Sequence, residues 1–135
     1  MRFLINRYKE AIPDFSKVLE YENSHRDALY YRAHAYSQVR QYERAVEDFS
    51  KVMKNEPENP KLWFNRGLAK MHLGQFRAAE NDLRQTLELK ADHEKAHFLL
   101  GMTLANMKSH GEAIDHYSQA IELDSTYKQA YYYRG

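Results

Sequence analysis

Residues 42–59 read YERAVEDFSKVMKNEPEN, and the pattern of this stretch recurs on both sides at one fixed spacing. A shift of 34 residues backwards gives YKEAIPDFSKVLEYENSH at 8–25, and forward shifts give related stretches at 76–93 and 110–127. Four alanines hold the same place in these stretches: Ala11, Ala45, Ala79 and Ala113. A constant period of this length predicts a stacked array of structural repeats.

Two further columns lie between these stretches, one with mostly large side chains and one with small ones. They are Leu29, Trp63, His97 and Tyr131, and then Ala33, Gly67, Gly101 and Gly135. Each period therefore predicts two amphipathic helices joined by a short turn, because small residues let two helix backbones approach where they cross. One hairpin cannot bury its own apolar face, so neighbouring hairpins are expected to stack into a continuous core.

These columns resemble the tetratricopeptide repeat family over the whole chain. Residues 60–93 show the pattern W-x-x-x-G followed by A-x-x-x-L, at Trp63, Gly67, Ala79 and Leu83. The preceding repeat matches the family pattern at Tyr36, Ala45, Phe49 and Pro57. The resemblance implies an all-α fold: a right-handed superhelical solenoid of antiparallel helix hairpins, with about three and a half repeats of 34 residues.

The repeat phase predicts a single domain over residues 1–135. It divides the chain into a partial repeat, three full repeats and a second partial repeat: 1–25, 26–59, 60–93, 94–127 and 128–135. Residues 1–6 would end an inward helix, Arg7 would lie in a turn, and 8–21 would form the outer helix. Pro13 is expected to kink or fray the first turn of that outer helix, because proline removes a backbone hydrogen bond.

Residues that favour helix ends lie at the expected repeat boundaries. Asn23 or Ser24 is predicted to cap the helix over 26–39, and Asp92 the helix over 94–107. Asn59 is predicted to cap the helix over 60–73, with Pro60 at its first position and Gly74 after its end.

The composition limits the kinds of partner. Hydrophobic residues make up 43% and charged residues 29% of the 135 residues, which suffices for a core and a solvated surface. The formal net charge is +1, so no global field attracts nucleic acid or an acidic membrane. No apolar run approaches the ~20 residues of a membrane-spanning helix, and MRFLI is too short for a signal peptide. The chain has no cysteine. We expect a cytoplasmic protein that binds neither nucleic acid nor membranes.

One short motif has the spacing of a zinc hydrolase. His93-Glu94-Lys95-Ala96-His97 matches H-E-x-x-H, in which two histidines bind zinc and the glutamate acts as a base. The repeat register explains each member otherwise, because His93 falls in a turn, Glu94 opens a helix and His97 occupies the Trp63 column. We therefore expect His97 to be buried and hydrogen-bonded, and we expect no metal, no cofactor and no enzymatic activity.

In the tetratricopeptide repeat family, ligands contact the exposed face of the inward helices, and the resemblance implies which residues line that face here. Three columns do so: Tyr30, Phe64, Phe98 and Tyr132; His34, Leu68 and Met102; Ser37, Met71 and Ala105. The candidate binding residues are Tyr30, His34, Phe64, Asn65, Leu68, Met71, Lys95, Phe98, Met102 and Tyr132. An exposed apolar centre with adaptable methionines is typical of a partner site. The aromatic column has an alternative structural role between neighbouring hairpins.

Members of this family that hold the acidic tails of chaperones use five polar residues as a clamp. The matching places here hold Tyr30, His34, Asn65, Lys95 and Leu99, so only Asn65 and Lys95 agree with the clamp. Without the other three, a carboxylate would lack its charge-assisted hydrogen bonds.

The sequence therefore predicts a non-catalytic scaffold that binds a peptide or a helix of a protein partner in its concave groove. The alternative is a structural, self-associating segment of a longer array. Its two ends are complementary, because residues 128–135 of one molecule and the start of another would nearly complete one repeat. Contacts of this kind are head-to-tail and do not need to close into a ring.

Overall fold

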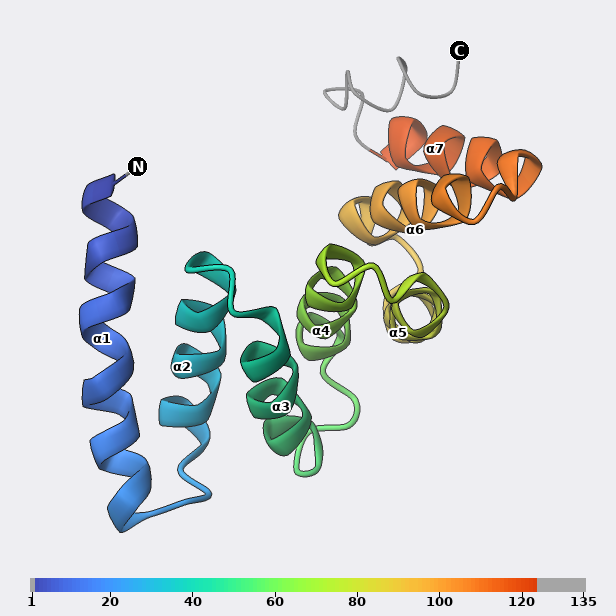
Figure 1. The fold of residues 1–135 in the computed structure, drawn as a ribbon. Coiled ribbons are helices and arrows are strands. Elements are labelled where there is room, and N and C mark those ends of the chain that lie inside the picture. The colour runs from blue at the N-terminus through green and yellow to red at the C-terminus, as the bar shows by residue number, and fades with distance from the viewer. Residues whose placement is uncertain (1, 124–135) are drawn as a thin grey trace. The chain divides into compact units, whose positions relative to one another are not determined.

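The computed structural model describes residues 2–123, which form α-helices and short connections (Figure 1). No strand occurs among these residues. The helices are α1 (Arg2–Tyr21), α2 (Arg26–Gln38), α3 (Tyr42–Met53), α4 (Pro60–His72), α5 (Phe76–Leu89), α6 (Glu94–Asn106) and α7 (His110–Leu123). The expectation of an all-α fold is confirmed.

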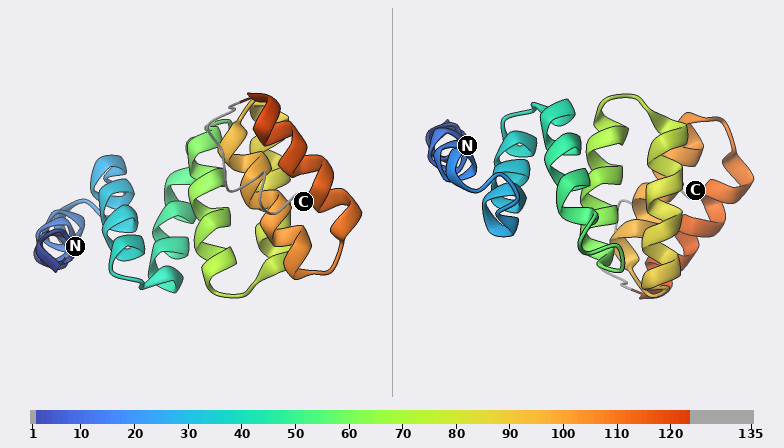
Figure 2. Two further views of the ribbon diagram at one scale, coloured as in Figure 1. Left: turned by 90° about the horizontal axis from the view of Figure 1, so that it is seen from above. Right: turned by 90° about the horizontal axis from the view of Figure 1, so that it is seen from below.

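The chain divides into two compact units, Met1–Pro57 and Glu58–Gly135. In the first unit α2 packs against both α1 and α3. In the second unit α4 packs against α5, α5 against α6 and α6 against α7, and α4 also contacts α6 (Figure 2). Consecutive helices therefore form the hairpins that the repeat columns predict.

The small-residue columns lie at the helix crossings, as expected. Ala33, Ala45 and Ala79 are fully buried, and Ala113 is 2% exposed. A Cβ atom built on Gly101 would lie 2.7 Å from Cδ1 of Tyr117, whereas one on Gly67 would lie 3.2 Å from Cγ of Leu83. The backbone of α6 thus approaches α7 more closely than a side chain would allow. The core of the second unit includes Leu83, Phe98, Leu100, Leu104, Tyr117 and Ile121.

Two of the three predicted helix caps are wrong by one or two residues. The residues that cap α2 and α6 are His25 and His93, in place of Asn23 or Ser24 and of Asp92. In both caps the imidazole Nδ1 accepts a hydrogen bond from the backbone N–H of the third helical residue, at 3.1 Å. The error has a physical reason: a neutral imidazole nitrogen at the N-cap can accept the same bond as the oxygen of the usual capping residues.

The predicted cap and first residue of α4 are confirmed, and the helix ends at His72, one residue before the predicted end. Asn59 Oδ1 accepts from the backbone N–H of Lys61, and Pro60 begins the helix. Gly74 follows the helix with φ +78°, and Arg40 and Lys108 adopt the same left-handed conformation one period away on either side. These three residues end the inward helix of each repeat.

The predicted turn at Arg7 is wrong, because α1 continues without a break through Arg7 and Pro13. A turn there would separate the first few residues from the helix and break backbone hydrogen bonds. Such a short segment gains little as a separate helix, because helix formation is cooperative and short helices are marginal. The structure therefore carries proline inside a single helix of 20 residues.

No helix within residues 2–123 combines the length and the hydrophobicity that crossing a lipid bilayer would require.

Candidate functional site

In the second unit the candidate residues lie on two helices that contact each other, α4 and α6. On α4, four candidates are half-buried: Phe64, Asn65, Leu68 and Met71. On α6, Lys95 is exposed, Met102 is half-buried, and Phe98 is 9% exposed within the core. Phe64 and Met102 pack against that same core cluster. The aromatic residues of this column thus take part in packing, while Leu68, Met71 and Met102 keep part of their apolar surface accessible.

In the first unit the candidates Tyr30 and His34 lie on α2, and both are half-buried. The ring of Tyr30 meets that of Phe49 edge-on at 6.2 Å between centroids, and the guanidinium of Arg26 lies 4.9 Å from its centroid. The ring of His34 meets that of Tyr8 edge-on at 5.9 Å. Tyr30 is thus held by aromatic and cation–π contacts. Tyr132, the remaining candidate, lies outside the described residues.

His34 also lines a pocket of about 320 Å³ between α1 and α2. Its other lining residues are Arg7, Tyr8, Ala11, Phe15, Tyr31 and Ala35. The rings of Phe15 and Tyr31 stack at 6.1 Å, although Tyr31 remains 52% exposed. On the α1 side the pocket is lined by Arg7 and by Tyr8, Ala11 and Phe15, which belong to the repeat columns.

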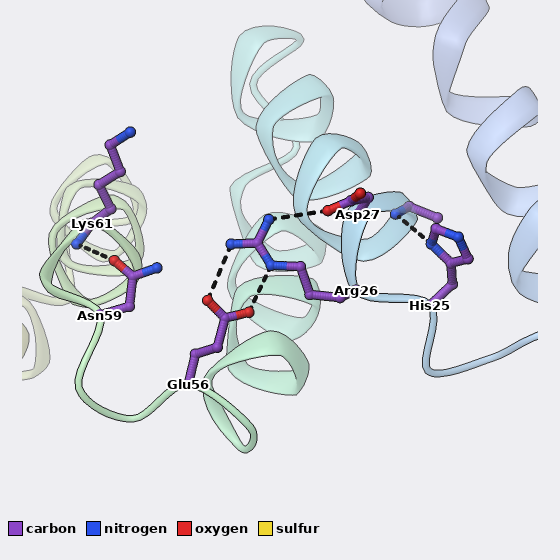
Figure 3. Close-up of polar contacts among 7 residues, drawn as sticks. His25, Arg26, Asp27, Glu56, Asn59 and Lys61 are labelled. Carbon is purple, nitrogen blue, oxygen red and sulfur yellow. Dashed lines mark hydrogen bonds and ion pairs between the residues drawn. The ribbon is translucent and has the colours of Figure 1, made fainter.

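The polar edges of the predicted surface begin at the first turns of the inward helices. In the first unit, Arg26 donates two hydrogen bonds to the carboxylate of Glu56, at 2.6 and 3.1 Å, and one to Asp27 (Figure 3). The hydrogen bonds to Glu56 raise the pKa of Arg26 further above its usual value. In the second unit, the exposed Lys61 and Lys95 occupy the second position of α4 and of α6.

His93 links the start of α6 to the candidate surface. Its ring stacks on Phe64 with 4.8 Å between centroids and an interplanar angle of 28°. Its Nδ1 meanwhile accepts from Ala96 N–H. Sequence reasoning placed His93 only in a turn and missed both contacts. Its column could have indicated the cap, because Asn59 precedes His93 by one period and is a favoured capping residue.

The structure gives His97 the buried, hydrogen-bonded role that was predicted. The side chain is 5% exposed, with Nε2 at 2.9 Å from the carbonyl oxygen of Ala91 and Nδ1 at 3.1 Å from Nδ1 of His116. Because a carbonyl only accepts, Nε2 of His97 carries a proton, and His116 donates to His97 when both rings are neutral. Both nitrogens of His97 are thus engaged within the protein. Within residues 2–123, no three histidine or carboxylate side chains are grouped so that they could hold a metal ion.

His116 and Arg84 line a pocket of about 410 Å³ beside this histidine pair. Burial lowers the pKa of His116, and the neighbouring His97 and Arg84 lower it further. Arg84 itself donates to the carboxylates of Glu80 and Glu112. The surroundings of the pocket therefore favour a neutral His116, and the guanidinium of Arg84 is already paired with carboxylates.

Two buried ion pairs hold the hairpins and were missed at the sequence level. Arg32 donates to both carboxylate oxygens of Asp48, at 2.7 and 2.9 Å, and Arg66 does so to Asp82, at 2.8 Å twice. Asp48 and Asp82 are each only 2% exposed. The signal was an arginine 16 residues before an aspartate, repeated after 34 residues. In the repeat at 94–127, Leu100 takes the place of the arginine and His116 that of the aspartate. The contact between His97 and His116 therefore occurs in the repeat that lacks this ion pair.

Helix hairpins that recur every 34 residues, with small side chains at each crossing, define a helical repeat protein. Two family models of the tetratricopeptide repeat match the sequence, one over residues 33–102 and one over residues 94–127. The first alone covers more than half of the chain. The chain belongs to the tetratricopeptide repeat family.

Solved structures of this family are similar to the chain. A crystal structure of MamA aligns with a TM-score of 0.90 at 21% identity, over 94% of this chain and 74% of MamA. The protein YrrB, described as having an unusual peptide-binding site, aligns with a TM-score of 0.82 at 28% identity, over 96% and 67%. The first repeat domain of Spaghetti (RPAP3), bound to the HSP90 peptide SRMEEVD, aligns with a TM-score of 0.78 at 26% identity, over 81% and 86%. None of the curated proteins compared with the chain matches it.

Proposed function

We propose that the chain is a non-catalytic scaffold that captures a peptide or a helix of a protein partner on the surface of α4 and α6. The observation that carries the proposal is the half-burial of Leu68, Met71 and Met102 on two helices in contact. A core position would bury such side chains, and a solvated helix face would be polar. Partly exposed apolar side chains beside an anchored core are typical of a docking surface.

The peptide-binding neighbours YrrB and Spaghetti support capture of a peptide, and the residues of this chain suggest its chemistry. Tyr30, His34 and Leu99 occupy places where a clamp for acidic tails needs polar residues. We propose apolar anchor residues in the peptide. Lys61 and Lys95 lie in the first turns of α4 and α6, where the helix dipole also favours an anion. An acidic residue of the peptide would fit at that end.

A selection from a random peptide library tests this function. Peptides are selected on the wild-type chain and then measured against the double variant Leu68→Ser, Met102→Ser. Removing central anchors typically costs about 2 kcal/mol of binding each. We expect the double variant to lose capture while its helicity stays nearly unchanged and its melting temperature falls only modestly, because Met102 also packs against the core cluster.

The matched control is the double variant Ile114→Ser, Leu123→Ser, which removes two apolar side chains that are 43% and 44% exposed on α7. This control is expected to bind the selected peptides as the wild type does. Equal binding by the Leu68, Met102 variant would refute the proposed surface. A large fall of its melting temperature would show that these two side chains belong to the core.

A second candidate, head-to-tail association, is favoured by the exposed face of α1. Asp14 shares the column of Asp48 and Asp82 but is exposed, and Ala11 is only half-buried although the other alanines of its column are buried. By sequence register, Arg134 has the place of Arg32 and Arg66. We propose that Arg134 of a second copy pairs with Asp14.

A charge exchange tests this pairing. We expect the sedimentation coefficient to rise over a hundredfold increase in concentration, roughly as mass action requires, and the rise to vanish in Asp14→Arg and in Arg134→Asp. The two variants mixed together should associate again, because each supplies the charge that the other lacks. A strictly monomeric wild type, or variants that associate unchanged, would exclude the pairing.

A further inference from the structure

The same place in three repeats holds a histidine, an asparagine and a histidine, and each one caps a helix. Nδ1 of His25 and of His93 accepts from a backbone N–H at 3.1 Å, and Oδ1 of Asn59 does the same at 3.1 Å. An amide oxygen keeps its lone pairs at every physiological pH. An imidazole nitrogen keeps its lone pair only while the ring is neutral. The histidine caps are therefore sensitive to protons, and the asparagine cap is not.

Protonation of His93 would destabilise the N-terminus of α6 in two ways. The new proton on Nδ1 would point at the N–H of Ala96, so the capping hydrogen bond would be replaced by two facing donors. The positive ring would also lie at the positive end of the helix dipole, where cations are unfavourable. Both effects act on the first turn of α6, which carries the candidate binding residue Lys95 and directly precedes Phe98.

The surroundings of His93 resist its protonation. Its burial lowers its pKa, and so do the charges of Lys90, which follows α5, and of Lys95 on α6. Glu94 on α6 opposes these effects. From α4, His93 meets the uncharged ring of Phe64. The neutral ring is thus the stable form in the folded chain, and a proton binds more readily when the cap opens.

The stack on Phe64 joins this cap to the candidate binding surface. Phe64 belongs to α4, so His93 bridges the two helices that carry Leu68 and Met102. A fraying first turn of α6 would remove the ring that supports Phe64 and shift Phe98 and Lys95 together. Residues that contribute to capture would then no longer be held in place.

We propose that partner capture by the α4–α6 surface is proton-gated, with neutral His93 as the binding-competent form and protonated His93 as the weak one. This inference rests on the proposed function, because it concerns the regulation of the same surface. It assigns a single residue to the gate and predicts that the substitution His93→Asn, which copies the cap at Asn59, removes the gate without removing the cap.

The cap itself is tested without any partner. NMR at about pH 7.5 should show His93 as the Nε2–H tautomer, since Nδ1 must accept. Hydrogen exchange of the Ala96 amide is then compared between wild type and His93→Asn at the same pH, so that the intrinsic pH dependence of exchange cancels. The ratio of rates should be near one at about pH 7.5 and rise roughly fivefold to tenfold at about pH 5, as expected from the loss of one cap. A constant ratio would overturn the proposal.

Capture is measured with a histidine-free peptide selected on the wild-type chain at about pH 7.5. Between about pH 7.5 and 5, its affinity for wild type should fall severalfold, with most of the fall below pH 6.5 because the folded chain lowers the pKa of His93. Its affinity for His93→Asn should stay constant over the same range. His25→Asn is the matched control, because it changes the equivalent cap on α2 and should retain the wild-type pH dependence. A proton-sensitive Ala96 amide with pH-independent capture would overturn the gate and leave the proposed function intact. If no peptide is captured at any pH, the proposed function fails and the gate fails with it.

Discussion

At the scale of single residues, the hairpins depend on buried carboxylates that are held by guanidinium groups. Asp82 is almost inaccessible and receives Arg66 through two hydrogen bonds and Lys70 at 3.0 Å. Two parallel N–H···O bonds fix the orientation of the pair as well as its charge. An isolated charge in this position would be strongly unfavourable, so the three side chains act together.

The substitution Asp82→Ala should destabilise the second unit by about 3 kcal/mol or more, because it leaves two cations facing each other without a counter-charge. Unfolding by urea, followed by circular dichroism, measures the loss. Asp14→Ala, measured at a concentration too low for association, is the matched control, since Asp14 occupies the same column but is exposed. Its effect should stay within about 0.5 kcal/mol, as for most surface positions. Equal effects of the two variants would contradict the assigned role of the ion pair.

The two glycines of the small-residue column should differ in their tolerance of a methyl group. In Gly101→Ala the Cβ would meet the buried ring of Tyr117 at 2.7 Å, so the helices must separate or the ring must move. Overpacking of this kind costs about 1–3 kcal/mol. In Gly67→Ala the contacts begin at 3.2 Å, and the gain in helix propensity of about 1 kcal/mol offsets much of the crowding. Thermal unfolding should therefore rank Gly101→Ala well below Gly67→Ala, and the reverse order would contradict the crossing geometry.

At this scale the sequence predicted the roles of residues that recur with the repeat period. It missed roles that depend on the chemistry of one particular side chain. The burial of Ala45, Ala79 and Ala113 and of His97 follows from the period. The capping role of His93 and its stack on Phe64 depend on which ring nitrogen carries a proton and on the local path of the chain, and a period does not contain that information. Binding by Leu68, Met71 and Met102 stays a prediction, because half-burial is compatible with it and does not require it.

At the scale of elements, α1 differs most from the expectation. The repeat phase predicted a turn at Arg7, but the backbone continues as one helix through Pro13. Proline at this position removes one backbone hydrogen bond and crowds the carbonyl of Lys9. Local helix continuity outweighed the repeat phase here, whereas in α2 to α7 the turn residues and the repeat phase agree.

The substitution Pro13→Ala should therefore stabilise α1. Proline in a helix interior costs about 3 kcal/mol relative to alanine, and Pro13 is exposed, so no packing is lost. We expect a gain of about 1–3 kcal/mol in the first unit and slower hydrogen exchange of the amides on both sides of position 13. An unchanged stability would mean that the helix is already interrupted near this proline in solution.

At the scale of the whole molecule, stability should fall on acidification. In the unfolded chain histidine binds a proton near pH 6.5, whereas the folded chain lowers the pKa of His93 and of His116. Between the unfolded pKa of about 6.5 and the lowered folded pKa values of the two histidines, the unfolded state holds more protons than the folded state. The contribution of these histidines to stability is therefore full above about pH 6.5 and is lost as the pH falls through their lowered folded pKa values. The melting temperature should decrease by roughly a few degrees over this range. The double variant His93→Asn, His116→Asn should show a flatter pH profile, and an equally steep one would refute this assignment.

The family and the all-helical fold could be predicted from the sequence because 34-residue columns record which residues meet at every crossing. The turn predicted at Arg7 is absent, because a local preference for a continuous helix is not encoded in the repeat period. The organisation as one domain also stays a proposal, because the columns describe contacts within hairpins rather than the connection between the units Met1–Pro57 and Glu58–Gly135.

The central claim is that a peptide binds to the surface of α4 and α6, and methionine methyl NMR tests it most directly. Met71 and Met102, two of the chain's five methionines, belong to the candidate surface, and Met1 lies outside the described residues. Met107 caps the end of α6, and Met53 is buried in the first unit. With ¹³C-methyl labels, titration of a selected peptide should shift the signals of Met71 and Met102 and leave those of Met53 and Met107 in place. Shifts confined to Met53 or Met107, with Met71 and Met102 unmoved, would contradict the account.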